Sequence, residues 1–205
     1  MSPVADVLRR PSPVDTWIGV CTGHIIKAAG TGNVDYDLSG HAGLPNLSGM
    51  EPGTWAIILD CTRRLAATGV WGSHVTGMLG FVANGGGSVS QYCCSFSMDD
   101  GVATSNTARR MSANAVSLID GNGSPDTQAT FVSFPTATTM RLNWSVSASS
   151  GWVIPYTIIT GLTGAKVVNW QTPTTAVDKY VSGVGFSPDL VLSVVGDITS
   201  AAPVS

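Results

Sequence analysis

The chain has 205 residues, of which 43% are hydrophobic and only 11% are charged, and its formal net charge is −3. A typical globular domain has roughly 25% charged residues, so the Glu, Lys and Arg that usually cover helix surfaces are scarce here. Abundant Ser, Thr, Val and Gly suit strands and turns, which predicts an all-β domain. The low charge also favours a surface that is covered in an assembly, although a Ser- and Thr-rich β-protein that is soluble alone is the alternative.

Residues 1–16 are predicted to form an anchoring arm with a short helix. Ser2 suits the N-cap, Pro3 suits the first turn and Pro11 ends the helix. A helix this short is not stable alone in water, so it must dock on its own domain or on a neighbour. The residues expected to make that contact are Val4, Val7, Leu8, Arg9 and Arg10.

Residues 17–162 read as one antiparallel β-sandwich unit of jelly-roll-like type. Short apolar segments alternate with turns rich in Gly, Pro, Asn and Asp, which is typical of sandwiches. Residues 40–53 and 99–110 are expected to form loops. The strands are expected within 16–29, 33–40, 54–62, 73–88, 88–98, 113–126, 127–134, 138–145 and 151–161.

Three segments allow side chains to be assigned to faces. In residues 139–144 the apolar side chains alternate with polar ones, which predicts a half-buried strand with Trp144 in the core. In residues 88–98 the same reasoning places Cys94 in the core and makes Cys93 the accessible thiol. Pro155 indicates an edge strand or a bulge.

Residues 163–205 are predicted to begin a second repeat. The segment Val-Asp-Tyr-Asp-Leu-Ser-Gly at 34–40 aligns with Val-Asp-Lys-Tyr-Val-Ser-Gly at 177–183. Both precede an apolar run that is expected to form a buried strand, 55–60 and 190–195. Such a partial unit cannot bury its own strands, so it must pack on the first unit or on a neighbouring subunit. A chance match of this short motif is the alternative.

The sequence gives little support for catalysis, so no enzyme, cofactor or metal site is predicted. His24, His41 and His74 lack the spacing of metal ligands, and neither a nucleophile elbow nor a phosphate-binding loop occurs. Asp99 and Asp100 fit a turn better than a carboxylate pair or a calcium site.

Candidate partner contacts outside the arm lie on expected loops. Trp71 is the best candidate for an exposed contact with protein or sugar. Two arginine pairs either bind carboxylates at a subunit contact or are solvated: Arg63 with Arg64, and Arg109 with Arg110. Because Lys and Arg form no run and no apolar stretch reaches roughly 18 residues, neither nucleic acid nor membrane is expected as a partner. The first residues lack the apolar region of a signal peptide, which favours synthesis in the cytoplasm.

Three phrases in the chain resemble a group of tailed-bacteriophage virion proteins. They are "MDDGVATSNTARR" at 98–110, "ATFVSF…MRLNWS" at 129–145 and "VSGVGFSPDLVLSVV" at 181–195. The resemblance extends over roughly residues 75–198 and is looser in the first 70 residues. It departs from the group at 153–164, where "VIPYTIITGLTG" replaces a "HYLALGG"-like segment. The resemblance implies a β-sandwich component of a phage particle without known catalytic residues.

Two functions follow as expectations. The first is a non-enzymatic virion structural protein, assembled in the host cytoplasm, that decorates or cements the capsid through β-edge and apolar subunit contacts. Its partners would be further copies of itself and the major capsid or tail protein. The second is a tail-associated module that binds a receptor or a host-surface glycan; a glycan-degrading enzyme is disfavoured, because Glu51 is the only glutamate.

Overall fold

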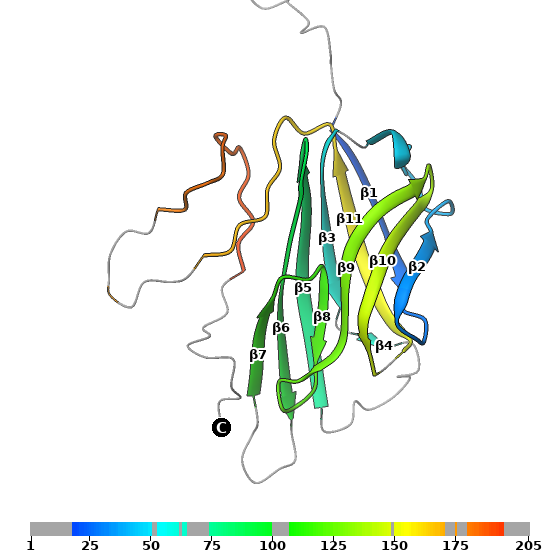
Figure 1. The fold of residues 1–205 in the computed structure, drawn as a ribbon, viewed down its shortest axis with the longest axis vertical. Coiled ribbons are helices and arrows are strands. Elements are labelled where there is room, and N and C mark those ends of the chain that lie inside the picture. Colours follow the sequence, from blue (N-terminus) through cyan, green and yellow to red (C-terminus); the bar gives the residue numbers. More distant parts are fainter. Residues whose placement is uncertain are drawn as a thin grey trace, which may run out of the picture.

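The computed structural model describes residues 18–50, 53–61, 63–64, 74–99, 107–148, 150–170, 175 and 180–194 (Figure 1). The proposed arm, Trp71 and Asp100 lie outside these residues. Within the described residues the regular structure is β-strand apart from one 3-10 turn, Ser48–Met50. The strands are β1 Gly19–Ile26, β2 Gly32–Asp37, β3 Thr54–Cys61, β4 Arg63–Arg64, β5 His74–Gly85, β6 Val89–Asp99, β7 Thr107–Ser112, β8 Val116–Ile119, β9 Pro125–Thr136, β10 Thr139–Ser147 and β11 Trp152–Thr160.

Two antiparallel sheets lie face to face (Figure 1). The large sheet has the order β1-β11-β3-β5-β6-β7, with β4 paired to β11, and the small sheet has the order β2-β10-β9-β8. Strands β5, β6 and β7 follow one another as a meander, after which residues 113–115 carry the chain across to β8. The prediction of an all-β antiparallel sandwich is confirmed.

Large aromatic side chains fill the core between β3 and β9. The indole of Trp55 packs edge-on against Phe131 and Phe134, with ring centroids 5.1 and 5.0 Å away. Trp144 is buried as predicted, and its Nε1 donates a hydrogen bond of 3.0 Å to the hydroxyl of Tyr36. The core between the large sheet and strands β9 and β10 is therefore stabilised mainly by burial of wide aromatic surfaces.

The core between β5, β6 and β8 is narrow. A Cβ atom on Gly80 of β5 would lie 1.9 Å from the carbonyl oxygen of Ala115, the residue that precedes β8. Glycine is thus required at position 80 because the two backbones approach too closely for any side chain.

The narrow core explains why the assignment of the two adjacent cysteines is wrong. Cys93 is 1% exposed, whereas Cys94 lies on the outer face and is half-buried. Small polar side chains fit the narrow space and satisfy their hydrogen bonds there: Ser95 Oγ donates to the Arg110 carbonyl oxygen, and Gln91 Oε1 accepts from the Phe131 N–H. The polar face of β6 therefore points inward and its apolar face points outward.

Of the two alternatives predicted for Pro155, an edge strand or a bulge, the edge strand is wrong, because β11 is an interior strand. The bulge fits the structure, since the register of β11 with β4 and β3 shifts by one residue between Val153 and Tyr156. Strand β11 pairs with β1 on one side, where Pro155 is opposite His24. On the other side β11 pairs with β4 up to Val153 and with β3 only from Tyr156 onward. The missing N–H of proline falls in this interruption of the ladder, which is why an interior strand tolerates it.

Lys27 is a buried lysine that links the two sheets just after β1. Its Nζ donates hydrogen bonds of 2.6 Å to the Ala28 carbonyl oxygen and to Ser147 Oγ at the end of β10. The ammonium group also lies 4.9 Å from the ring centroid of Trp144, within cation–π range. Burial lowers the pKa of Lys27, and the Asp126 carboxylate opposes that shift.

The apolar run expected as a buried strand near the C-terminus has a different structure. Residues 180–194 contain no strand, and Leu190, Val191 and Leu192 are exposed. Val181, the counterpart of the fully buried Leu38 in the proposed repeat, is exposed as well. The chain after β11 instead forms an excursion beside the sandwich, on the left of Figure 1. That residues 163–205 form a partial second repeat stays a prediction.

Candidate interaction surface

The most distinctive surface is an exposed apolar face on the outside of β5, β6 and β7, which we call the outer apolar face. Strand register places Val75 opposite Met98, and Cys94 opposite Met111. Phe96 and Met98 are 42% and 47% exposed, although aromatic and thioether side chains usually lie inside a domain. The face comprises Val75, Leu79, Phe81, Tyr92, Cys94, Phe96, Met98 and Met111.

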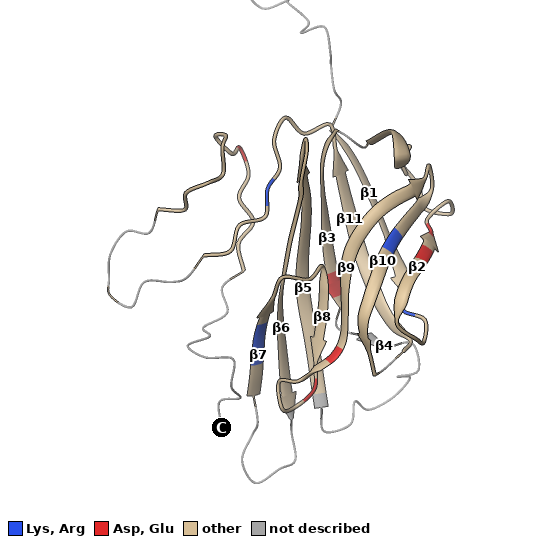
Figure 2. Ribbon diagram, in the orientation of Figure 1, with Lys and Arg blue, Asp and Glu red and all other residues tan. Residues whose placement is uncertain are grey.

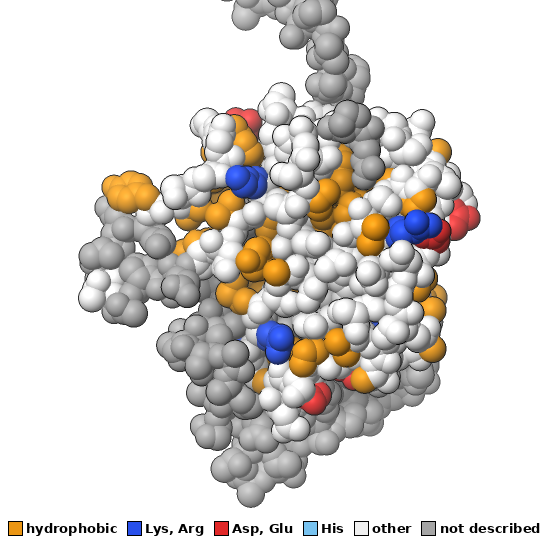
Figure 3. Space-filling view, viewed as in Figure 1, with side chains coloured by type: hydrophobic (Ala, Val, Ile, Leu, Met, Phe, Trp, Pro, Cys, Tyr) orange, Lys and Arg blue, Asp and Glu red, His pale blue; other side chains and the backbone are white. Residues whose placement is uncertain are grey.

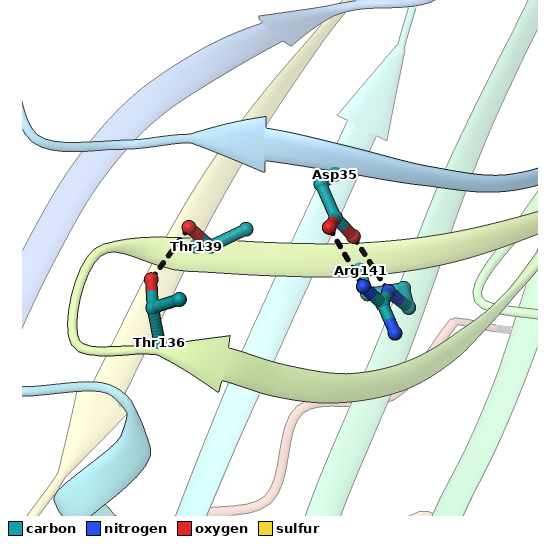
Figure 4. A network of polar contacts seen from close by, with 4 residues as sticks. All are labelled: Asp35, Thr136, Thr139 and Arg141. Carbon is teal, nitrogen blue, oxygen red and sulfur yellow. Dashed lines mark hydrogen bonds and ion pairs between the residues drawn. The ribbon is translucent and has the colours of Figure 1, made fainter.

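Few charged residues lie on the strands of either sheet (Figure 2). On the outside of the small sheet, Arg141 Nε and Nη2 bind the two carboxylate oxygens of Asp35 at 2.6 and 2.7 Å (Figure 4). This fork geometry lowers the pKa of Asp35 and raises that of Arg141. Nearby, Thr136 and Thr139 share a hydrogen bond of 2.6 Å across the β9–β10 turn (Figure 4).

The arginine pairs lie on strands, so their assignment to loops is wrong. Arg63 and Arg64 form β4. Arg109 projects outward from β7 into solvent beside Cys94, and Arg110 projects toward the sandwich interior. The Nε of Arg110 is buried and has no hydrogen-bond partner among the described residues. Of the predicted contact residues, the structure brings only Arg109 next to the outer apolar face; Val4, Val7, Leu8, Arg9, Arg10 and Trp71 lie outside the described residues.

Strand β7 also exposes a sheet edge. It pairs with β6 through all six of its residues, and no strand in the described part of the chain pairs with its other side. Unpaired backbone N–H and C=O groups on such an edge are a template for another strand. The edge adjoins the outer apolar face, so both features belong to one continuous surface.

The C-terminal excursion begins at the hairpin end of the same sheet. The Val167 N–H donates a hydrogen bond of 2.9 Å to Ser90 Oγ, and Ala165 is buried against the end of β5. The chain then folds back, because Lys166 Nζ donates to the Gly183 carbonyl oxygen and the Phe186 ring lies against Gly164. Apolar side chains are visible on this excursion at the left of Figure 3.

One polar cluster escaped the sequence analysis because its members are far apart in the chain. Tyr156 on β11 makes a short hydrogen bond to Nδ1 of His41, whose ring lies 5.9 Å from that of His24. Burial raises the pKa of Tyr156, and the neighbouring Cys21 reinforces the rise. The cluster ties the loop after β2 to β1 and β11, and we assign it a structural role.

Among the described residues, no group of three or more His, Cys, Asp or Glu side chains is placed to hold a metal ion. The described part of the chain also contains no helix long and apolar enough to cross a membrane. No family model matches the chain, and no curated protein or solved structure matches it.

A thiol-reactive dye should label the folded protein at Cys94 and not at Cys93. Burial raises the pKa of Cys93 to about 12, whereas Cys94 is half-buried and Arg109 opposes the rise in its pKa. Because the thiolate is the reactive form and burial raises the pKa of Cys94, its labelling should continue to accelerate as the pH rises above the usual thiol pKa of about 8.5. The readout is mass spectrometry of the undenatured protein.

Two single variants serve as controls for this labelling. Cys94→Ser should abolish it, and Cys93→Ser should leave it intact. Labelling that survives Cys94→Ser would contradict the placement of the two thiols.

Proposed function

We propose that this chain is a non-enzymatic structural component of a bacteriophage virion that decorates or cements the particle surface. The single observation that carries the proposal is the outer apolar face, which exposes Phe96 and Met98 beside an unpaired strand edge. Contiguous apolar surface rimmed by polar residues is typical of protein-binding sites. The low charge of the chain fits a protein whose surface is covered in an assembly.

The resemblance to phage virion proteins adds independent support. Both halves of its second phrase fall in the sandwich: residues 129–134 lie in β9 and residues 140–145 lie in β10. Both supply buried side chains, Phe131 and Trp144 among them. This shared phrase therefore contributes to the packing of the sandwich core.

The finer elements belong to the same proposal. These are a jelly-roll-like topology of the sandwich, a helical arm over residues 1–16 that anchors the protein, and a partial second repeat over residues 163–205. The partners would be the major capsid or tail protein and further copies of this chain, and the location would be the virion. Neither nucleic acid nor membrane has a role in this scheme.

Quantitative mass spectrometry of purified particles tests the proposal. Copy numbers in the hundreds relative to the major capsid protein would support decoration or cement. A few to a few tens of copies would instead favour the alternative, a tail-associated module that binds a receptor or a glycan. Absence from the particle would overturn the structural role altogether.

A further inference from the structure

We propose that residues 189–194 of one copy add as a strand to the free edge of β7 in a second copy. The inference rests on the proposed assembly role and deepens it by naming the partner, a second copy of this chain, and the two contacting segments. Each segment is present on every copy, and each lacks a strand partner in the described structure.

The donor segment has the composition of a buried strand but lies in solvent. Leu190, Val191 and Leu192 are 69%, 71% and 54% exposed. Apolar side chains gain roughly 25 cal/mol for each Å² removed from water, so this exposure leaves a substantial driving force unused. The segment lies beyond the contacts of Lys166 and Phe186 that hold the excursion together, so a partner can bind it without disturbing those contacts.

The acceptor edge matches the donor in length and in pattern. Residues 189–194 number the same as the six residues of β7. In an added strand, side chains alternate between faces, so Leu190, Leu192 and Val194 would share one side. That side would lie beside Ala108 and Arg110, the residues of β7 that point toward the sandwich interior.

The opposite side of the added strand matches the outer apolar face in charge as well. Asp189, Val191 and Ser193 would share this side, on which β7 presents Arg109 and Met111. In a parallel register that sets Leu190 beside Ala108, Asp189 would lie diagonal to Arg109 and Val191 diagonal to Met111. Opposite charges and apolar pairs across neighbouring strands are stabilising.

The position at which the excursion contacts the sandwich favours β7 of a second copy over β7 of the same chain as the acceptor. The described contacts of the excursion with the sandwich, at Ala165 and Val167, lie at the β5–β6 hairpin end. In the single chain residues 190–192 stay exposed, and no strand among the described residues pairs with the outer edge of β7. Exchange of identical segments between two copies forms two such contacts at once, which is a low-cost route to a symmetric dimer.

Light scattering of the purified full chain during size-exclusion chromatography tests the inference. The wild type should have about twice the 21.1 kDa mass of one chain, because a closed exchange joins two copies. The double variant Leu190→Asp, Leu192→Asp should be monomeric and should keep the circular-dichroism spectrum of the folded sandwich, since both side chains are exposed in the single chain. Tyr180→Ser, at an 84% exposed apolar position of the same excursion, is the matched control and should stay dimeric.

A charge exchange tests whether β7 is the acceptor. Arg109→Glu should weaken the dimer by placing two acidic groups together, and adding Asp189→Arg should restore it. A wild type that is monomeric at every concentration, a double-aspartate variant that stays dimeric, or a failed charge rescue would each overturn the inference. These results come from the isolated chain, so they are separate from the particle copy number that tests the proposed function.

Discussion

Gly80→Ala should destabilise the sandwich by about 3 kcal/mol, the upper end of the usual cost of overpacking. The added Cβ would lie 1.9 Å from the carbonyl oxygen of Ala115, and a backbone atom cannot rotate away as the end of a side chain can. To relieve the clash the two sheets must separate where β5 and β8 meet. Chemical denaturation followed by circular dichroism measures the change, and the melting temperature should fall by roughly 2–4 °C for each kcal/mol.

Gly87→Ala is the matched control for this variant. Gly87 lies in the turn between β5 and β6, where a Cβ atom would meet nothing within 4 Å. Its replacement should leave the free energy of unfolding nearly unchanged. Equal effects of the two substitutions would contradict a close approach of the backbones at Gly80.

Trp55→Ala should cost about 3–5 kcal/mol of unfolding free energy, the usual range for removal of a large core aromatic residue. Trp55 is fully buried and packs against Phe131 and Phe134, which themselves pack edge-on at 5.0 Å. The deletion removes the centre of this cluster, and the remaining rings cannot fill the cavity. Equilibrium unfolding in urea gives the difference.

Trp55→Phe separates packing from hydrogen bonding at the same site. The indole Nε1 is buried without a hydrogen-bond partner among the described residues, which costs stability in the native protein. Phenylalanine keeps an aromatic ring and removes that donor, so its cost should be well below half that of alanine. Similar losses for the two variants would show that ring packing contributes little here.

Local alternation in the sequence predicts much of the sandwich. Met140, Leu142 and Trp144 are fully buried as expected. One face of β10 contacts the core and the other contacts solvent, so its apolar and polar side chains simply alternate. Nine of the eleven described strands overlap a predicted range, and the two that do not are β4 and β7. These features depend on residues that are neighbours in the chain, so they can be predicted from the sequence alone.

The features that were mispredicted depend on contacts distant in sequence. The burial of Cys93 follows from how closely β8 approaches β5 and β6, which no pattern within β6 encodes. His24 and His41 meet only because the loop after β2 folds against β1. Arg109 lies on a strand because β7 pairs with β6, although the sequence of residues 99–110 predicts a loop.

The reversed faces of β6 have a consequence for how the chain folds. A slip of one residue between β5 and β6 would turn the apolar side chains inward, as hydrophobic collapse alone would favour. The turn opposes this slip, because Asn84 Oδ1 accepts hydrogen bonds from the Gly86 and Gly87 N–H groups at 3.0 and 3.1 Å. Asn84 therefore helps to hold the register that keeps the polar face of β6 inside, so the turn and not hydrophobicity alone specifies which face of β6 is buried.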